Sequence, residues 1–398
     1  MCRGPKHFLI KNLVRMGFKP WPPRALRVGA KHDQHLEGEL STATTDIPHR
    51  DYRLSESNAQ RAFDQGLASA EWYHTEVDRK AMKALMKRRD GPAIRDTAIW
   101  LGLLIGSGAA LVLLWGSWWS LPFILIYGVS YGSACDARWH ECGHGTAFKT
   151  AWMNDVIYQI ASLMVMRNPV TWRWSHARHH TDAIIVGRDA EIAVMRPPDL
   201  FRFVANFFGI FDVWYSMKAL VLNASGVLQE HEKSFVPDAE INKAIFAASV
   251  HIAIYAATVV AAVIMASWLP LVLIGLPRMY GCWHMVMTGI LQHGGLADNV
   301  IDHRLNSRTV LMNPISRFIY WNMNYHVEHH MFPMVPFHAL PQLHELIKHD
   351  LPAPNTSIWD GYREMIPAFL RQLRYEDYYV RRELPLTAKP YREDLHEI

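Results

Sequence analysis

The chain has 398 residues, of which half are hydrophobic and 12% are aromatic, and its formal net charge is +4. This composition is too apolar for a disordered protein, and the charge is too small to indicate a nucleic-acid partner. The four cysteines include no CxxC pair, which argues against a disulfide framework and against an iron–sulfur cluster.

The first long uncharged block, residues 97–135, contains no Asp, Glu, Lys or Arg. One membrane-spanning helix needs roughly 20 residues, so the block is long enough for two. Its centre, Trp115 to Pro122, combines tryptophan, glycine and proline, as is typical of a tight turn at a membrane interface. We therefore expect two transmembrane helices, at about 98–116 and 122–139.

A second uncharged block, residues 244–277, predicts another hairpin, with helices at about 244–266 and 271–293. Arg278 lies inside the fourth of these helices, where a charge is costly. Either its side chain faces the protein interior, or the turn of this hairpin lies at 275–278 instead.

Lysines and arginines between residues 80 and 95 precede the first predicted helix, and the positive-inside rule places such a flank in the cytosol. Because both hairpin turns are uncharged, we expect the polar parts of the chain and both termini on that face. The expected regions are a basic and polar N-terminal region (1–95), a membrane domain (96–346) and a cytosolic C-terminal tail (347–398), solvated after about residue 370. Two apolar but interrupted stretches, 152–166 and 200–222, suit helices that lie in the interface.

Histidine is the most informative residue type, because many of the 22 copies form three clusters just outside the predicted helices. The clusters read HECGHG at 140–145, HARHH at 176–180 and NYHVEHHMFPMVP at 324–336. Residues three and four apart share one face of a helix, so each cluster can direct two or three imidazoles at one point. Eight imidazoles are too many for one zinc ion and match two six-coordinate ions. Imidazole suits Fe, Cu, Zn or Ni, and we favour a pair of irons that activates O₂ at a membrane surface.

These clusters resemble the histidine boxes of the integral-membrane fatty acid desaturase family, which also contains hydroxylases. The resemblance covers about residues 98–346. It implies an all-α integral membrane fold, with four transmembrane helices in two hairpins and a cytosolic helical cap that carries a non-haem di-iron site. The wording of the boxes is similar to a bacterial branch that includes a rhizopine-catabolism protein, which implies a multi-pass protein of the bacterial inner membrane.

The resemblance also implies the ligand set, with no catalytic residue beyond the ligands and no organic cofactor. The family supplies a ninth ligand from the cytosolic end of the fourth helix, and His293 matches that position. Acyl-CoA-type members have an asparagine four residues earlier; this chain has Gly289 there, so such an asparagine ligand is not supported. The nine expected iron ligands are His140, His144, His176, His179, His180, His293, His326, His329 and His330.

The implied activity is that of an O₂-dependent oxidoreductase, in first place a fatty acyl desaturase that introduces a double bond. A di-iron hydroxylase or monooxygenase is the alternative, including one that demethylates a small methoxylated metabolite. The chain has no cytochrome b5 haem motif, so electrons are expected from a separate ferredoxin or cytochrome with its reductase. The other expected partners are the lipid bilayer and an acyl-lipid substrate. A histidine-rich metal transporter would place its ligands inside the helices, and a metal-stabilised scaffold would need only four; we favour both less.

Several residues outside the boxes have two possible roles. A carboxylate can orient a metal-bound imidazole through its second ring nitrogen, or can be solvated or form an ion pair. The carboxylates in question are Asp136, Glu141, Asp182, Asp189 and Glu328. Among the other histidines, we expect His251 and His284 to be packed or hydrogen-bonded, and His303, His338 and His344 to lie beside the site or at the surface.

Overall fold

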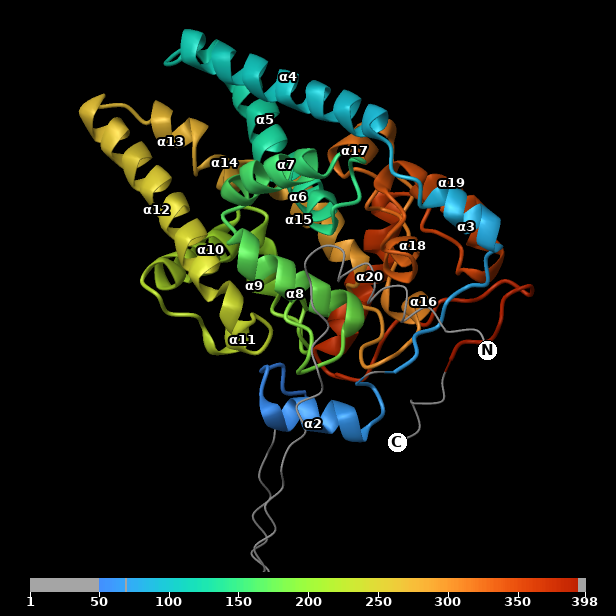
Figure 1. The fold of residues 1–398 in the computed structure, drawn as a ribbon. Helices are drawn as coiled ribbons and strands as arrows, with labels where there is room; N and C mark the ends of the chain where they lie inside the picture. Colours follow the sequence, from blue (N-terminus) through green and yellow to red (C-terminus); the bar gives the residue numbers. More distant parts are fainter. Residues whose placement is uncertain (1–49, 69, 393–398) are drawn as a thin grey trace, which may run out of the picture. The chain divides into compact units, whose positions relative to one another are not determined.

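The computed structural model describes residues 50–68 and 70–392, which belong to one compact unit, residues 48–398. Residues 1–49 of the predicted N-terminal region therefore lie outside the description. The regular elements of the described residues are helices (Figure 1). In chain order they are α2 (Glu56–Asp64), α3 (Arg79–Leu85), α4 (Asp90–Leu114), η1 (Trp118–Ser120), α5 (Leu121–Val129), η2 (Ser130–Ala134), α6 (Cys135–His144), α7 (Ala151–Met164), α8 (Pro169–Thr181), α9 (Leu200–Asn206), α10 (Ile210–Ala224), α11 (Glu230–Lys233), η3 (Asp238–Glu240), α12 (Ile241–Ile264), α13 (Leu269–Leu273), α14 (Pro277–Tyr280), α15 (Trp283–Gly289), η4 (Ile290–Gln292), α16 (His303–Asn306), α17 (Pro314–Ile319), α18 (His326–Met331), η5 (Phe337–Ala339), α19 (Leu340–Ile347), η6 (Lys348–Asp350) and α20 (Ile358–Gln372).

Two helical stretches, Arg79–Leu114 and Asp238–Ile264, are long and apolar enough to cross a membrane. Only 28% of the most apolar window of each is buried, whereas a core helix of a soluble protein would be mostly buried. Large apolar side chains such as Leu113, Val263 and Ile264 are exposed on them, which suits contact with lipid. These stretches agree with the first and third predicted spans, and the far ends of α4 and α12 lie toward the same side in Figure 1.

The second predicted span lies in one helical run that joins α5, η2 and α6. Pro122 in the first turn suits a helix start, and Gly145 ends the run in the left-handed conformation, with φ at 67°. In its middle, η2 is a π-helical turn, which shifts the register of the side chains that follow. The first histidine box therefore lies on the last turns of this run.

The predicted fourth span, residues 271–293, is not one continuous helix; the structure breaks it into α13, α14, α15 and η4. Gly275 has a φ of 94°, and a Cβ on Gly281 would lie 1.8 Å from the carbonyl oxygen of Gly128. The break lets residues 269–293 pack on the α5–α6 run, backbone against backbone at Gly128 and Gly132. These two segments, residues 121–144 and 269–293, are called the two arms below. A continuous fourth transmembrane helix was thus a wrong expectation, and the four-span arrangement stays a prediction.

Arg278 is buried and its guanidinium faces the interior, as the first reading expected. The chain turns between α12 and α13 and breaks again at Gly275, so the second reading is not needed. Nη1 of Arg278 donates to the carbonyl oxygen of Gly132 at 2.8 Å, and its Nη2 lies 3.0 Å from Oδ2 of Asp212. Asp136 approaches within 3.7 Å. Because a buried charge is tolerated only when it is paired, these contacts explain an arginine inside an apolar block.

The remaining helices surround the inner ends of these arms. The largest core cluster joins side chains of α4, α6, α7 and α8 to residues 320–351. α7 covers most of the predicted stretch 152–166, and the predicted stretch 200–222 divides into α9 and α10 at Gly209, which has a φ of 63°.

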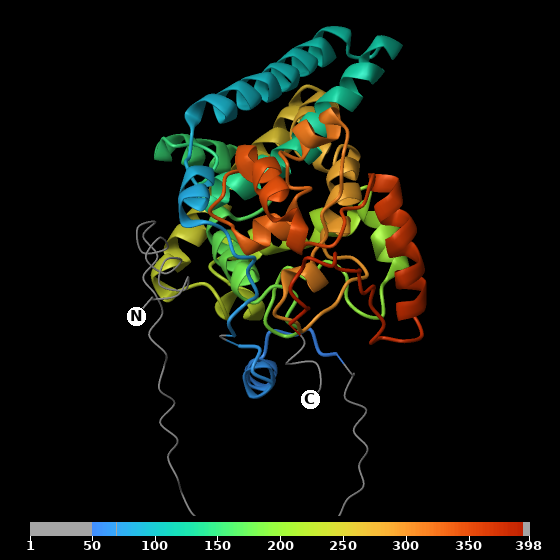
Figure 2. The same cartoon turned by 90° about the vertical axis from the view of Figure 1, so that its right-hand side faces the viewer.

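The C-terminal tail is not the solvated arm that its charges suggested. After α20, which lies along one edge of the body in Figure 2, the chain packs against the unit as far as residue 392. The backbone N–H of Val380 donates to the carbonyl oxygen of Gly295, and Nε of Arg382 pairs with Glu364 at 3.3 Å. Several charged residues of the tail, among them Asp377, Arg382 and Lys389, therefore have partners within the fold.

Candidate metal centre

All nine predicted ligands come together at the inner ends of the apolar arms, although they come from four parts of the chain. The first box lies at the end of α6, the second on α8 and the third on α18, while His293 follows η4 directly. Asn168 caps α8 by accepting from the backbone N–H of Val170, and Pro169 begins the helix. Each box is helical, so the i, i+3 and i, i+4 spacing directs its rings to one side, as predicted.

The nine imidazoles form two groups, and in each group the ligand atoms lie within 4.8 Å of one another. The first histidine group contains His140, His144, His176, His180 and His329. The second histidine group contains His179, His293, His326 and His330. Boxes two and three each contribute to both groups, which ties the two positions into one centre.

In the first group, one ring nitrogen has more close neighbours than hydrogen bonds can satisfy. Nε2 of His176 lies 3.2 Å from that of His140, 3.0 Å from that of His144 and 3.2 Å from that of His180. Nδ1 of His176 faces Oε2 of Glu191 at 2.8 Å, which leaves Nε2 with one lone pair for three neighbours. A cation shared by these nitrogens satisfies all of them at once.

The separations also indicate the coordination geometry. With metal–nitrogen distances of about 2.1 Å, adjacent ligands of an octahedral ion lie about 3.0 Å apart, and those of a tetrahedral ion about 3.4 Å apart. In the second group, Nε2 of His326 lies 3.0 Å from Nε2 of both His293 and His330. The separations in the second group match the octahedral value, and those in the first group lie between 3.0 and 3.2 Å, at or between the two values.

Acceptors on the far side of three rings fix which nitrogen faces the centre. Besides the Glu191 contact of His176, Nδ1 of His179 lies 2.8 Å from Asp189, and Nδ1 of His293 lies 2.7 Å from the backbone carbonyl oxygen of Asn306. Metal-bound histidines commonly have such partners, which hold the ring and its tautomer.

Burial favours the neutral imidazole that a metal requires. Desolvation first, and then the neighbouring histidines, lower the pKa well below the ordinary value for six of the ligands: His140, His176, His180, His326, His329 and His330. Burial also lowers the pKa of His179, but the charge and hydrogen bond of Asp189 together outweigh it and raise the pKa to about 9. Metal binding at His179 would therefore release a proton.

Of the five carboxylates considered from the sequence, only Asp189 contacts a ligand histidine. Glu141 accepts from Oγ1 of Thr146, and Asp182 pairs with Arg188 at 3.0 Å. The other two also have partners elsewhere: Asp136 lies near Arg278, and Glu328 pairs with His344 and accepts from Thr309.

Sequence reasoning missed Glu191, which binds both His176 and Ser175. The available signal was the acidic pair at residues 189 and 191, directly after the second box in a mostly apolar segment. Its pairing with His176 depends on how the loop after α8 folds back.

Three histidines outside the ligand set lie where expected. His251 is buried in α12, and Nε2 of His284 lies 3.1 Å from Oγ of Ser316. His303 is buried beside the centre, where its ring stacks on Trp72 with centroids 4.3 Å apart and lies 5.0 Å from the ring of His330.

Comparison with known proteins agrees with this site. The family model for fatty acid desaturase matches residues 116–362, which is more than half of the chain and includes all nine histidines. The chain is also similar to an omega-6 fatty acid desaturase, the endoplasmic reticulum isozyme 1, of Glycine max, with 34% identity over 83 residues. That match spans 19% of this chain and 21% of the relative. The two apolar stretches and the family together make this a membrane protein, and the chain belongs to the fatty acid desaturase family.

Proposed function

We propose that this chain is a membrane-bound, O₂-dependent desaturase that holds two non-haem irons and acts on a long-chain acyl group. The observation that carries the proposal is the pair of histidine groups, whose ring nitrogens lie close together at the ends of apolar helices. Membership of the family supports the oxidoreductase class.

Iron is the metal we propose for both groups. The first group supplies five imidazoles and the second four, and neither includes a cysteine or a carboxylate. An all-imidazole shell suits a redox-active transition metal such as iron and does not suit Mg²⁺ or Ca²⁺, which prefer oxygen ligands. When bound, the two irons would supply the activation of O₂ and the removal of hydrogen from an unactivated C–H bond.

The chain's own residues would keep that chemistry in place. Glu191, Asp189 and the carbonyl oxygen of Asn306 hold three rings from behind, so that their Nε2 atoms face inward. His326 and His329 are almost fully buried, which keeps bulk water from the centre. In the overall reaction, two hydrogens from the substrate, two electrons from a donor and two protons reduce one O₂ to two waters and leave a carbon–carbon double bond.

Location supports an acyl substrate. The first box follows directly on the apolar run of α5, and His293 follows α15, on which Trp283 is 40% exposed. An acyl chain that lies in the bilayer could therefore reach the centre between the arms. We propose that the centre faces the cytosol and receives electrons from a separate ferredoxin or cytochrome.

Product analysis tests the proposal. Lipids and small metabolites would be compared by mass spectrometry in cells that express the unaltered chain, a His329→Ala variant and a His251→Ala variant. His251 is a matched control, because it is a buried histidine outside both groups. We expect a new double bond in acyl lipids with the unaltered chain and the control, and none with His329→Ala. Iron-dependent consumption of a methoxylated metabolite with unchanged lipids would refute the desaturase and favour the monooxygenase alternative.

A further inference from the structure

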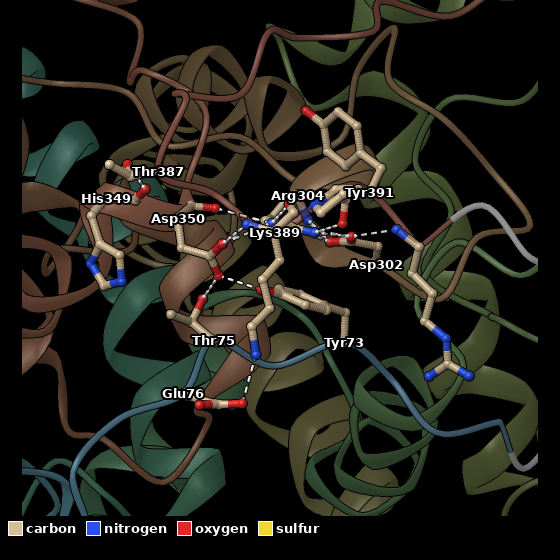
Figure 3. Close-up of polar contacts among 12 residues, drawn as sticks. Tyr73, Thr75, Glu76, Asp302, Arg304, His349, Asp350, Thr387, Lys389 and Tyr391 are labelled. Carbon is tan, nitrogen blue, oxygen red and sulfur yellow. Dashed lines mark hydrogen bonds and ion pairs between the residues drawn. The ribbon is translucent and has the colours of Figure 1, made fainter.

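A buried arginine outside the histidine groups gathers three distant parts of the chain. Arg304 of α16 has a side chain with no exposed surface, and its Nε donates to Asp302 at 3.0 Å. Its Nη1 donates to Oδ1 of Asp350 at 3.1 Å, and Figure 3 shows these groups converging on the guanidinium. The carbonyl oxygens of Lys389 and Pro390 each accept from it at 2.9 Å. Nη2 also donates to Oδ2 of Asp302 at 2.7 Å, so the five donor positions of the guanidinium are matched by acceptors.

The N-terminal segment, residues 70–78, reaches the same point from the opposite end of the chain. The ring of Tyr73 lies 3.7 Å from the guanidinium carbon of Arg304, and its hydroxyl donates to Asp350 at 2.5 Å. Thr75 donates to the same carboxylate at 2.7 Å, and the backbone N–H of Lys389 does so at 3.0 Å (Figure 3). Asp350 therefore joins the N-terminal segment to the C-terminal segment, residues 387–392.

The short helix that carries Arg304 contacts the second histidine group directly. The carbonyl oxygen of Asn306, at the end of α16, accepts from Nδ1 of His293. His303, at its start, lies against the ring of His330. The side-chain amide of Asn306 also donates to the carbonyl oxygen of Ala183 at 3.1 Å, in the loop that leads to Asp189.

The first histidine group has a different support. His140 and His144 lie on α6, which is continuous with the apolar run of α5, and His176 is held by Glu191. The contacts of α16 described above go to His293 and His330, both in the second group. The second metal position thus has a support that the first lacks among these contacts, namely α16 with the two terminal segments, in addition to the membrane arm that ends at His293.

We propose that Arg304 is a positioning residue for the second metal, and that residues 70–78 and 387–392 act through it as a clasp. Loss of the clasp frees α16, which moves Asn306 and His303 away from the rings they hold. The second ion is then released while the first is retained. This inference rests on the proposed function, because it requires that both histidine groups bind a metal.

The test shortens the full chain after Leu386 and compares it with a chain shortened after Arg392. The first variant removes the carbonyl oxygens of Lys389 and Pro390, whereas the control keeps the clasp whole. Both are purified with iron in detergent, and iron per chain is counted by native mass spectrometry during exposure to a chelator. Arg304→Lys, which keeps the charge but loses the planar fork, serves as a second variant.

We expect two ions in the unaltered chain and the control, lost in a single slow phase. In the chain shortened after Leu386 and in Arg304→Lys, one ion should leave about 10- to 100-fold faster, as for other outer partners of metal ligands. Hydrogen exchange of residues 296–310 in the metal-free chain should rise in the same variants. If these variants lose both ions at the control's rate, or lose both ions together, the clasp proposal is wrong while the proposed function still stands. An unaltered chain without bound metal would refute the proposed function, and the clasp with it.

Discussion

The broken arm at residues 269–293 approaches the α5–α6 run so closely that, among the glycines the structure describes, an added Cβ would meet its nearest atom at Gly281. A Cβ built on it would lie 1.8 Å from the carbonyl oxygen of Gly128 and 2.1 Å from its carbonyl carbon. Both neighbours are backbone atoms, so no side chain can turn aside, and the arms must separate. Overpacking of this kind costs about 1–3 kcal/mol or more. The gain of about 0.4–1 kcal/mol from restricting the unfolded chain at this position does not offset it.

We therefore predict that Gly281→Ala lowers the free energy of unfolding by at least about 1 kcal/mol, while Gly102→Ala does not. Gly102 is a fair control, because it lies in α4 and a Cβ there meets no atom within 4 Å. Since about 1.4 kcal/mol is a tenfold change in an equilibrium constant, thermal unfolding in detergent resolves the difference. The arms carry His140 and His293, so iron content should fall as well. Equal unfolding temperatures for the two variants would refute the packing of the arms.

Three further predictions concern the site, the topology and the substrate. Glu191→Gln and Asp189→Asn should each weaken metal binding about 10- to 100-fold, because His176 and His179, respectively, lose the carboxylate that holds the ring. Metal affinities measured by competition with a chelator that are unchanged in these variants would contradict this. In a background without Cys2, a cysteine placed at Trp119, which is 76% exposed beyond the end of α4, should react with an impermeant thiol reagent added outside the cell. A cysteine placed at Lys348 should not react, and the reverse pattern would invert the proposed orientation. Met287→Ala in α15 should change the chain length or the position of the double bond without loss of iron, and an unchanged lipid profile would argue against an acyl path along α15.

Local periodicity was enough to predict which histidines of each box point to the same side. The i, i+3 and i, i+4 spacing holds wherever a helix forms, and α6, α8 and α18 are helical over their boxes. His293 could not be placed by spacing, because it depends on the packing of two separate arms. Its position was expected from the family resemblance, and the structure brings it to the second group.

The errors arose where packing decides the outcome. Hydropathy averages over residues 271–293 and predicts one helix, although Pro277 and the close contact of Gly281 with Gly128 favour breaks. The charges of the C-terminal tail suggested solvation, yet Arg382 finds Glu364 within the fold. Such partners are far apart in sequence, and composition alone does not reveal them.

X-ray absorption at the metal edges, together with metal counting on the purified full chain, tests the central claim most directly. We predict two irons per chain, each surrounded by imidazole nitrogens at about 2.1 Å with no sulfur neighbour. His140→Ala and His330→Ala should each weaken a different one of the two ions, since they belong to different groups. A single tetrahedral zinc per chain, or two ions that both persist in these variants, would contradict the account.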